Sequence, residues 1–408
     1  MKNLLERVKN ISINEYTYSL PNNRIAQNPL DQRDQSKLLV YSKGRLQEDT
    51  FQNLDAHLTA GQQIIFNDSR VVYARLKFPI SGNKSIEVFC LAPEHNPGDM
   101  QAALSRCGNT SWVCLVGGAR KWKTEWLEMR SGGITLQVRI KEKVDNRFVI
   151  QFQWTPEKKS FHDILETFGH VPLPPYITRE DKEDDQARYQ TVYANRDGSV
   201  AAPTAGLHFT DEVLTNLRKK DIEDQYLTLH VGAGTFLPVK AQRMEDHEMH
   251  SEWMVLDRTF LHSSSLEKPW TVVGTTALRA LETLYWLGVK AAEGKLSMES
   301  LSLSQWEPYE LPQHYGRMEA FQALRAFTNE LDDSVALSTR LLIAPGYKIR
   351  TADRLITNFH QPGSTLLLLV AAAIGEDWKK VYDYALRHDF RFLSYGDSCL
   401  LEMHSLPL

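Results

Sequence analysis

Hydrophobic and polar residues follow one pattern between Val71 and Trp154 that is not seen elsewhere in the chain. Short alternating or β-branched runs recur there, separated by turn signals such as Gly117-Gly118 and Ser131-Gly-Gly133. Several short strands at such spacing are typical of a small β-barrel. The pattern predicts strands at Val71–Leu76, Ser85–Leu91, Trp112–Val116, Ile134–Ile140 and Phe148–Trp154.

The rest of the chain alternates predicted strands with predicted helices, which favours an α/β sheet. Strands are expected at Tyr226–Val231, Val272–Thr275, Leu341–Ala344 and Leu355–Thr357, with helices at Phe161–Phe168, Ala277–Leu287 and after Ser364. Thr210 is expected to cap a further helix, with acidic residues in its first turn and lysines in its last. The predicted fold class is α/β: a layered α/β domain (1–69 and 155–408) interrupted by an inserted small β-barrel domain (70–154). The polar and aromatic segment 289–339 breaks the alternation, and we expect a mostly helical insertion there.

Composition places the chain among ordinary globular proteins. Of its 408 residues, 42% are hydrophobic and 24% are charged. The longest apolar run, Leu366–Ile374, is far too short to span a bilayer. The four cysteines form no C-x-x-C pair, so a cytoplasmic protein with no membrane association is expected. The net charge of −4 gives no general positive field for nucleic acid, and the acidic stretch from Glu180 to Asp185 is interpreted as a solvated loop.

Histidines gather in one part of the sequence. Thirteen histidines in 408 residues predict about one or two in a window of 43, yet His208, His230, His247 and His250 fall within 208–250. Histidine is the side chain best suited to proton transfer near neutral pH. Any one of them is as readily a structural histidine, but the group together predicts a site.

Two short motifs near these histidines suggest other chemistry. His230-Val-Gly-Ala-Gly-Thr235 contains a G-x-G but no third glycine, so it fails as a dinucleotide fingerprint. In His247-Glu-Met-His250 the histidines are three residues apart, not the four that place zinc ligands on one helical face. A metal-dependent hydrolase using His247, His250 and Glu252 therefore stays open as an alternative of another class.

The segment Val273-Gly-Thr-Thr-Ala-Leu-Arg279 leads from a predicted strand into a helix through small hydroxyl residues. The N-terminus of a helix offers free N–H groups to a carboxylate or a phosphate. An ordinary capped helix explains the same residues equally well.

Several longer segments together resemble one known family. The segment Asp197-Gly-Ser-Val-Ala-Ala-Pro-Thr-Ala-Gly-Leu-His-Phe-Thr210 is similar to the signature of the S-adenosylmethionine:tRNA ribosyltransferase-isomerase family of queuosine synthesis. Further segments agree in order along nearly the whole chain outside 289–339: Ile25–Asp34, Phe66–Arg70, Tyr189–Tyr193, Thr228–Phe236, Glu245–Glu252, Val273–Arg279, Ile356–His360 and Ser394–Asp397.

The resemblance implies an α/β catalytic domain interrupted by a β-barrel, and it implies a reaction. The ribosyl part of S-adenosylmethionine moves to the aminomethyl group of a deazaguanine base in the tRNA anticodon, rearranges to an epoxycyclopentane, and releases adenine and methionine. S-adenosylmethionine is then a consumed co-substrate, and no metal or redox cofactor is expected. The expected partners are S-adenosylmethionine and this tRNA, with no obligate protein partner.

The resemblance selects site positions, to which we assign roles as hypotheses. The catalytic set for proton transfer and its orientation is His208, His230, Asp246, His250 and Glu252. The substrate-binding set is Thr204, Thr275, Thr276, Arg279, Asn358 and His360. The basic turn Arg120-Lys-Trp-Lys123 is the predicted RNA contact, with a solvated turn as the equally weighted alternative.

The sequence departs from the family's usual pattern at Gly363 and Ala277, and in the segment 289–339. These positions bear on recognition of the acceptor more than on donor chemistry. Two further alternatives follow: a paralogue that keeps the donor site but modifies another base or amine, and a non-catalytic RNA-binding descendant.

Overall fold

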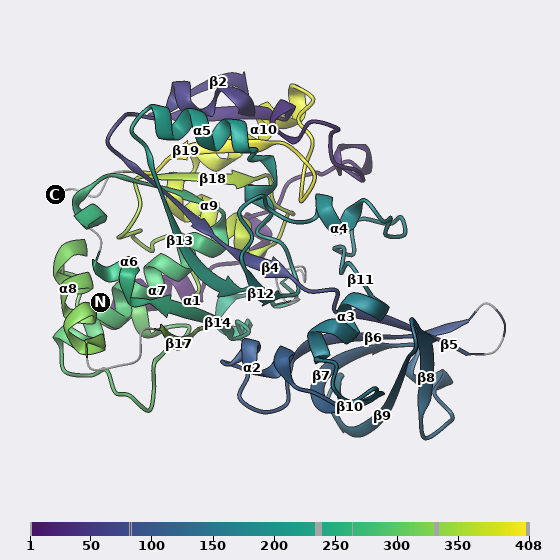
Figure 1. Cartoon of the computed structure of the whole chain (residues 1–408). Coiled ribbons are helices and arrows are strands. Elements are labelled where there is room, and N and C mark those ends of the chain that lie inside the picture. Colours follow the sequence, from purple (N-terminus) through teal and green to yellow (C-terminus); the bar gives the residue numbers. More distant parts are fainter. Residues whose placement is uncertain are drawn as a thin grey trace.

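The computed structural model of the chain describes residues 2–80, 82, 84–232, 239–262, 264–329 and 334–404. Within these ranges the strands form a ten-stranded sheet, a seven-stranded sheet and a two-stranded pair. The predicted mixed α/β fold is confirmed. The seven-stranded sheet stands to one side of the larger sheet (Figure 1).

The ten-stranded sheet has a parallel centre. Its four parallel strands lie side by side in the order β13 (Glu223–His230), β3 (Gln63–Asn67), β15 (Trp270–Val273) and β18 (Arg354–Asn358). The carboxyl ends of parallel strands meet at one edge of a sheet, so these four bring their following loops together. Flanking them are β14 (Glu252–Asp257), β17 (Ser334–Thr339) and β16 (Ser302–Leu303) on one side, and β19 (Ser398–Glu402), β1 (Lys37–Ser42) and β2 (Arg45–Thr50) on the other.

Helices cover both faces of this sheet, and the alternation along β3 shows why. Ile65 packs into the larger hydrophobic core, whereas Ile64 and Phe66 point into a second core on the opposite face. The larger core contains α7 (Thr275–Ala292), α8 (Arg317–Thr328), α9 (Thr365–Ile374) and α10 (Asp377–Arg387). The second contains the 3-10 segment η4 (Phe51–His57) and α5 (Asp211–Lys219).

Residues predicted to begin helices do so through their side chains. The Thr210 hydroxyl accepts a hydrogen bond from the Val213 N–H at 3.3 Å, and α5 follows. In the same way Ser364 accepts from the Leu367 N–H at 3.2 Å at the start of α9. Each cap satisfies one of the N–H groups that the first turn leaves without a partner.

The seven-stranded sheet is antiparallel and curls into a half-barrel (Figure 1). Its strands, in spatial order, are β11 (Gly169–His170), β5 (Arg75–Pro79), β6 (Ser85–Pro93), β7 (Asn109–Gly117), β10 (Arg147–Thr155), β9 (Ile134–Val144) and β8 (Leu127–Ser131). Two helices pack into its hydrophobic core: α2 (Met100–Ser105) and α3 (Phe161–Phe168). The core of this unit therefore extends beyond residue 154.

The remaining elements are short. They are the helices α1 (Lys2–Lys9), α4 (Asp185–Arg188) and α6 (Arg258–His262), the parallel pair β4 (Ser69–Val71) and β12 (Arg196–Ser199), and the 3-10 turns η1 (Ile13–Glu15), η2 (Asn22–Arg24), η3 (Arg33–Gln35), η5 (Ala119–Lys121), η6 (Thr204–His208), η8 (Met244–Asp246), η9 (Ser264–Glu267) and η10 (Glu307–Tyr309). In the described part of the chain, no helix combines the length and the apolar character needed to cross a membrane.

Three expectations about secondary structure differ from the structure. The single strand expected at Val71–Leu76 is divided, because β4 ends at Val71, β5 begins at Arg75, and residues 72–74 belong to neither. Leu341–Ala344 is buried but forms no strand, because side chains occupy its carbonyl groups: Arg279 donates to the Leu341 oxygen and Tyr309 to the Leu342 oxygen. The segment 289–339 is helical only in part. It contains the end of α7, η10 and α8, but also β16 and β17, which extend the large sheet beside β14.

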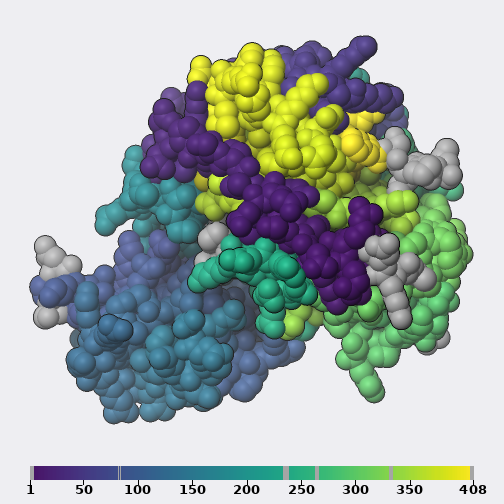
Figure 2. Space-filling model, turned by 180° about the vertical axis from the view of Figure 1, so that it is seen from behind, coloured from purple at the N-terminus to yellow at the C-terminus, as the bar shows by residue number. Residues whose placement is uncertain are grey.

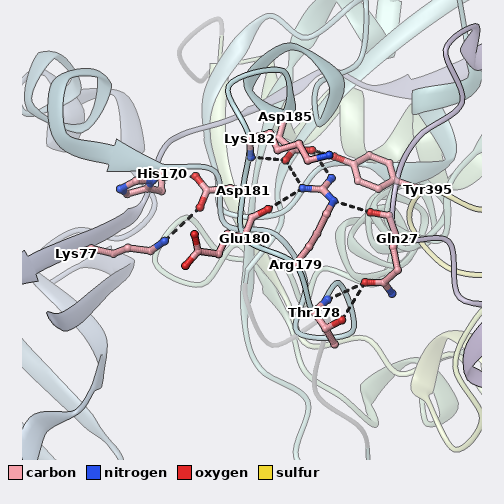
Figure 3. A network of polar contacts seen from close by, with 10 residues as sticks. All are labelled: Gln27, Lys77, His170, Thr178, Arg179, Glu180, Asp181, Lys182, Asp185 and Tyr395. Carbon is pink, nitrogen blue, oxygen red and sulfur yellow. Dashed lines mark hydrogen bonds and ion pairs between the residues drawn. The ribbon is translucent and has the colours of Figure 1, made fainter. Parts of the chain in front are cut away.

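The acidic stretch predicted to be a solvated loop is solvated only in part: Glu180, Glu183 and Asp184 are exposed, whereas Asp181 and Asp185 form a structured joint. Asp185 is buried, and its carboxylate accepts two hydrogen bonds from Arg179, at 2.6 and 2.8 Å, and one from the Tyr395 hydroxyl at 2.9 Å. Asp181 contacts His170 at 2.8 Å and Lys77 at 3.3 Å, both on strands of the half-barrel. Figure 3 shows these contacts joining the two parts of the molecule.

The N-terminal segment also serves to join distant parts of the sequence. It runs across the surface over the C-terminal region (Figure 2). The Phe392 N–H donates to the Arg24 carbonyl at 2.8 Å, and the Gly363 N–H donates to the Tyr16 carbonyl at 2.9 Å. The loops that follow β18 are thereby fixed from outside.

A close approach of two helices gives a stability prediction. A Cβ atom at Gly288 on α7 would lie 2.1 Å from the Ala320 carbonyl oxygen on α8, so the backbones must separate to accept it. We expect Gly288→Ala to lower the free energy of unfolding by about 1–3 kcal/mol, the range for overpacking. Gly316→Ala, where nothing lies within 4 Å, is the control and should cost at most about 1 kcal/mol through the altered cap. Equal losses in denaturant titrations of the two variants would contradict this account.

Candidate active site

One pocket of the α/β unit lies at the carboxyl ends of its parallel strands. Val231 follows β13, Gly274 follows β15, and Asn358 ends β18. The pocket has a volume of about 740 Å³, including space open to solvent. In open α/β sheets, ligands bind at this edge where the order of strands reverses, and here β13 and β15 lie on opposite sides of β3.

Five of the six predicted substrate-binding residues line this pocket: Thr204, Thr275, Thr276, Asn358 and His360. Arg279, the sixth, is one helical turn further along α7 and does not line it. Sequence reasoning assigned no role to Tyr176, Gln361, Ser364 or Ser394, which also line the pocket. Ser394 and Tyr176 belong together, because their hydroxyl oxygens are 2.6 Å apart.

The N-terminus of α7 faces this pocket. Gly274 precedes the helix with φ of 91°, a conformation that glycine adopts without strain, and no side chain caps the helix. The N–H groups of the first turn are therefore left for a ligand, beside the hydroxyls of Thr275 and Thr276. The alternative of an ordinary side-chain cap is not what the structure shows.

A chain of hydrogen bonds behind the pocket wall fixes Asn358. Thr204 donates to the Asn358 side-chain oxygen at 3.0 Å, and the Asn358 amide nitrogen lies 3.1 Å from His208 Nε2. His208 Nδ1 lies 2.8 Å from the Ser36 hydroxyl. Both ring nitrogens of His208 are thus engaged, and burial, followed by the charge of Arg391, lowers its pKa to about 3. The contact with Asn358 lets His208 hold that side chain in place.

Glu252 is the centre of a second network. Its side chain is 1% exposed and accepts a hydrogen bond from Arg279 at 2.6 Å. Its other carboxylate oxygen lies 3.3 Å from Nε2 of His250, which is 28% exposed. His250 also lies beside the end of β13, because a Cβ atom at Gly232 would be 3.8 Å from its Cδ2. The structure thus brings together the predicted residues His250, Glu252 and Arg279 next to the pocket.

The loop that carries His250 is anchored by Gln305, a residue of the segment 289–339. The Gln305 amide donates to the His247 carbonyl at 2.7 Å and accepts from the Met249 N–H at 2.9 Å. The Gln305 amide thus forms the donor and acceptor hydrogen bonds that the backbone of a neighbouring strand would otherwise form. No sequence motif indicated it, because the two partners are more than 50 residues apart.

The other predicted catalytic residues lie apart from this network. The His230 ring packs against Gly198, and burial lowers its pKa to about 4. Asp246 is exposed at the end of η8. His360 lines the pocket, contacts the Thr357 hydroxyl through Nε2 at 2.8 Å, and has its pKa lowered to about 3 by burial. Residues 233–238, including Gly234 of the G-x-G, lie outside the described residues.

No group of three or more His, Cys, Asp or Glu side chains suited to a metal ion occurs in the described ranges. The hydrolase alternative based on His247, His250 and Glu252 therefore gains no support. The predicted RNA contact lies on η5 and the turn after it. Arg120, Lys121 and Lys123 are exposed, whereas Trp122 packs against the half-barrel core.

The fold and the pocket define a mixed α/β protein with a pocket at the ends of its parallel strands. The family model described as "Queuosine biosynthesis protein" matches residues 13–401. A protein of Halothermothrix orenii named S-adenosylmethionine:tRNA ribosyltransferase-isomerase is 36% identical over 402 residues, covering 96% of this chain and 100% of that protein. A protein of the same name from Geotalea uraniireducens is 34% identical over 398 residues, with 96% and 100% covered.

A crystal structure titled S-adenosylmethionine tRNA ribosyltransferase, from Thermotoga maritima, is 24% identical with a TM-score of 0.45, covering 95% of this chain and 99% of that one. By the family model and the curated relatives, the chain belongs to the queuosine biosynthesis protein family.

The buried neutral state of His208 predicts how stability responds to acid. Its folded pKa of about 3 lies below the ordinary value of about 6.5, so between these pH values the unfolded chain binds a proton that the folded chain does not. Stability is therefore lost as pH falls from about 6.5 towards 3. We expect His208→Gln to flatten the fall in unfolding free energy by up to about 1.4 kcal/mol per pH unit. The exposed His95→Gln is the control, and a parental pH slope in His208→Gln would contradict the assignment.

Proposed function

We propose that this chain transfers and isomerises the ribosyl group of S-adenosylmethionine onto the aminomethyl-deazaguanine base of tRNA, giving epoxyqueuosine and releasing adenine and methionine. The observation that carries the proposal is the match of curated relatives of that name over at least 95% of this chain. The pocket at the strand ends supports it, because Thr204, Thr275, Thr276 and Asn358 line it together beside the N-terminus of α7, which no side chain caps.

The donor is assigned to this pocket. The methionine carboxylate of S-adenosylmethionine would lie at the N-terminus of α7, where free N–H groups and the hydroxyls of Thr275 and Thr276 favour an anion. Thr204 and Asn358, held by the chain that runs through His208, would contact the ribose hydroxyls. Arg279 would act through Glu252, since it does not line the pocket.

Proton transfer is assigned first to His250. The reaction requires a base to remove a proton beside the sulfonium and an acid to assist adenine departure. His250 is partly exposed next to the end of β13, and Glu252 orients its ring while Arg279 compensates the buried carboxylate. The low pKa values of His208 and His230 keep both neutral, which suits positioning and disfavours them as acids. No metal or redox cofactor is required, because the sulfonium already activates the sugar.

The acceptor side is assigned to the half-barrel. We take the half-barrel as the inserted domain expected at 70–154, with α3 and β11 added at its end, and propose that its basic turn, Arg120 to Lys123, contacts tRNA phosphates. The joint formed by Arg179, Asp181 and Asp185 would hold this domain at a fixed orientation to the donor pocket. A cytoplasmic location and the absence of an obligate protein partner remain part of the proposal.

The activity has a direct test. The purified chain, incubated with S-adenosylmethionine and tRNA carrying the aminomethyl-deazaguanine base, should release adenine and methionine in equal amounts, and chelators should not stop it. Chromatography of the small-molecule products measures both. Release of S-adenosylhomocysteine would show methyl transfer and reject the proposal. Adenine release only with a different base or amine would identify the paralogue alternative.

The assignment of His250 predicts a kinetic effect. His250→Ala should lower single-turnover rate at saturating substrates by about a hundredfold, the usual scale for an acid–base group. The Michaelis constant for S-adenosylmethionine should change little. Glu252→Gln, which keeps the shape but removes the charge, should lower the same rate and shift its pH profile. His95→Ala, at a surface histidine also paired with a glutamate, is the matched control. Parental rates in His250→Ala would remove it from the mechanism.

A further inference from the structure

A second, smaller pocket lies behind the wall of the donor pocket. It has a volume of about 300 Å³, including open space, and Ser394 lines both pockets. His208 lines the smaller pocket, and its bonded partner Asn358 lines the larger one. Ser394 and the bonded pair of His208 and Asn358 would therefore lie between a ligand group in the smaller pocket and a ligand in the donor pocket.

Three arginines line this smaller pocket, and no aspartate or glutamate does. Arg33 donates to the Gln190 carbonyl at 3.0 Å, and Arg188 donates to the carbonyls of Asp31 and Leu30. Among the ion pairs of the described residues, only Arg391 of the three has a carboxylate partner, Asp397 at 3.2 Å. Carbonyl oxygens orient a guanidinium but carry no charge to compensate it.

The arrangement concentrates positive charge. Burial and the neighbouring Arg188 both lower the pKa of Arg33, and the charge of Arg391 adds to burial in lowering the pKa of His208. Like charges held close together in a partly buried site repel one another unless an anion lies between them. Guanidinium groups are suited to phosphate because their donors match two of its oxygens at once.

We propose that Arg33, Arg188 and Arg391 form a site for one phosphodiester group of tRNA, adjacent to the nucleotide whose base enters the donor pocket. This inference rests on the proposed function, which supplies tRNA as the substrate. The outer groove beside Arg33 and Arg188 also carries Asp31, Asp34 and Glu212, so it repels a longer stretch of backbone. The site therefore takes a single phosphate and sets the register of the acceptor strand.

The same oxyanion chemistry is present in the carboxylate of S-adenosylmethionine, and the test separates the two sources. The test uses Arg33→Gln and Arg188→Gln, singly and together. The control is Arg218→Gln, which removes the same charge from an arginine on α5 that pairs with Asp224 on β13. Binding of a tRNA transcript is measured over about 50–200 mM salt, the range in which phosphate contacts dominate the affinity. Binding of S-adenosylmethionine is measured by calorimetry, and folding by thermal unfolding.

Each pocket variant should reduce the log–log salt slope by about 0.7–0.9 per lost phosphate contact, whereas Arg218→Gln keeps the parental slope. Affinity for S-adenosylmethionine should stay within about twofold of the parental value. Because Arg33 and Arg188 also bond to backbone carbonyls, Arg33→Lys and Arg188→Lys provide charge-conserving variants, which should retain most of the slope.

A parental salt slope in the folded double variant would overturn the inference. So would a loss of S-adenosylmethionine affinity with an unchanged tRNA slope, which would assign the arginines to the donor carboxylate. The parental chain's own release of adenine tests the proposed function separately. If the parental chain releases no adenine while the arginine variants still change the salt slope of tRNA binding, the proposed reaction is rejected and the phosphate site is supported.

Discussion

The buried carboxylate of Glu252 imposes the constraint on which the candidate site depends. A carboxylate that is 1% exposed must be compensated, and here the Arg279 guanidinium at 2.6 Å does this. The pair joins β14 to α7, and its second oxygen faces His250. Removing one partner of such a pair typically costs about 3–5 kcal/mol, because the other charge remains buried. The orientation of the histidine loop is thus linked to the stability of the sheet and its central helix.

The pocket itself is preorganised by neutral hydrogen bonds. Ser36, His208, Asn358 and Thr204 form a continuous chain from the N-terminal segment to the pocket lining, and Tyr176 meets Ser394 on the other side. These groups come from parts of the sequence that are far apart. Contacts such as Gln305 with the histidine loop and Asp185 with Tyr395 hold those parts in register. Rigid polar groups of this kind suit a reaction whose substrate must be held in one conformation.

Local patterns in the sequence were sufficient for much of the fold. Period-two alternation located β6, β7, β9 and β10, and capping residues located the starts of α5 and α9. The prediction of a strand at Leu341–Ala344 was wrong. An apolar run indicates that a segment is buried, but not whether its carbonyl groups accept hydrogen bonds from the backbone or from side chains. The burial of Asp185 in the acidic stretch was missed for a similar reason, since Arg179 and Tyr395 reach Asp185 only in the folded chain.

The sequence predicted which residues lie at the candidate site better than it predicted what each of them does. The resemblance to a known family pointed to Thr204, Thr275, Thr276, Asn358 and His360, which the fold brings to one pocket. The state of each histidine depends on burial and on partners distant in sequence, as His208 shows with Ser36 and Asn358. Gln305 has no local signature, and Ser394 and Arg33 lie in segments that resemble the family but had no role assigned. Their roles arise only from residues that approach from other elements.

The central claim is that the sugar of S-adenosylmethionine, and not its methyl group, passes to the nucleic acid. The most direct measurement uses S-adenosylmethionine labelled with carbon-13 in the ribose in one reaction and in the methyl group in another. Mass spectrometry of the nucleosides from the reacted tRNA then locates the label. Ribose label should appear in one deazaguanine nucleoside, and methyl label should remain in the released methionine. Methyl label in the tRNA, or no ribose label in it, would contradict the account.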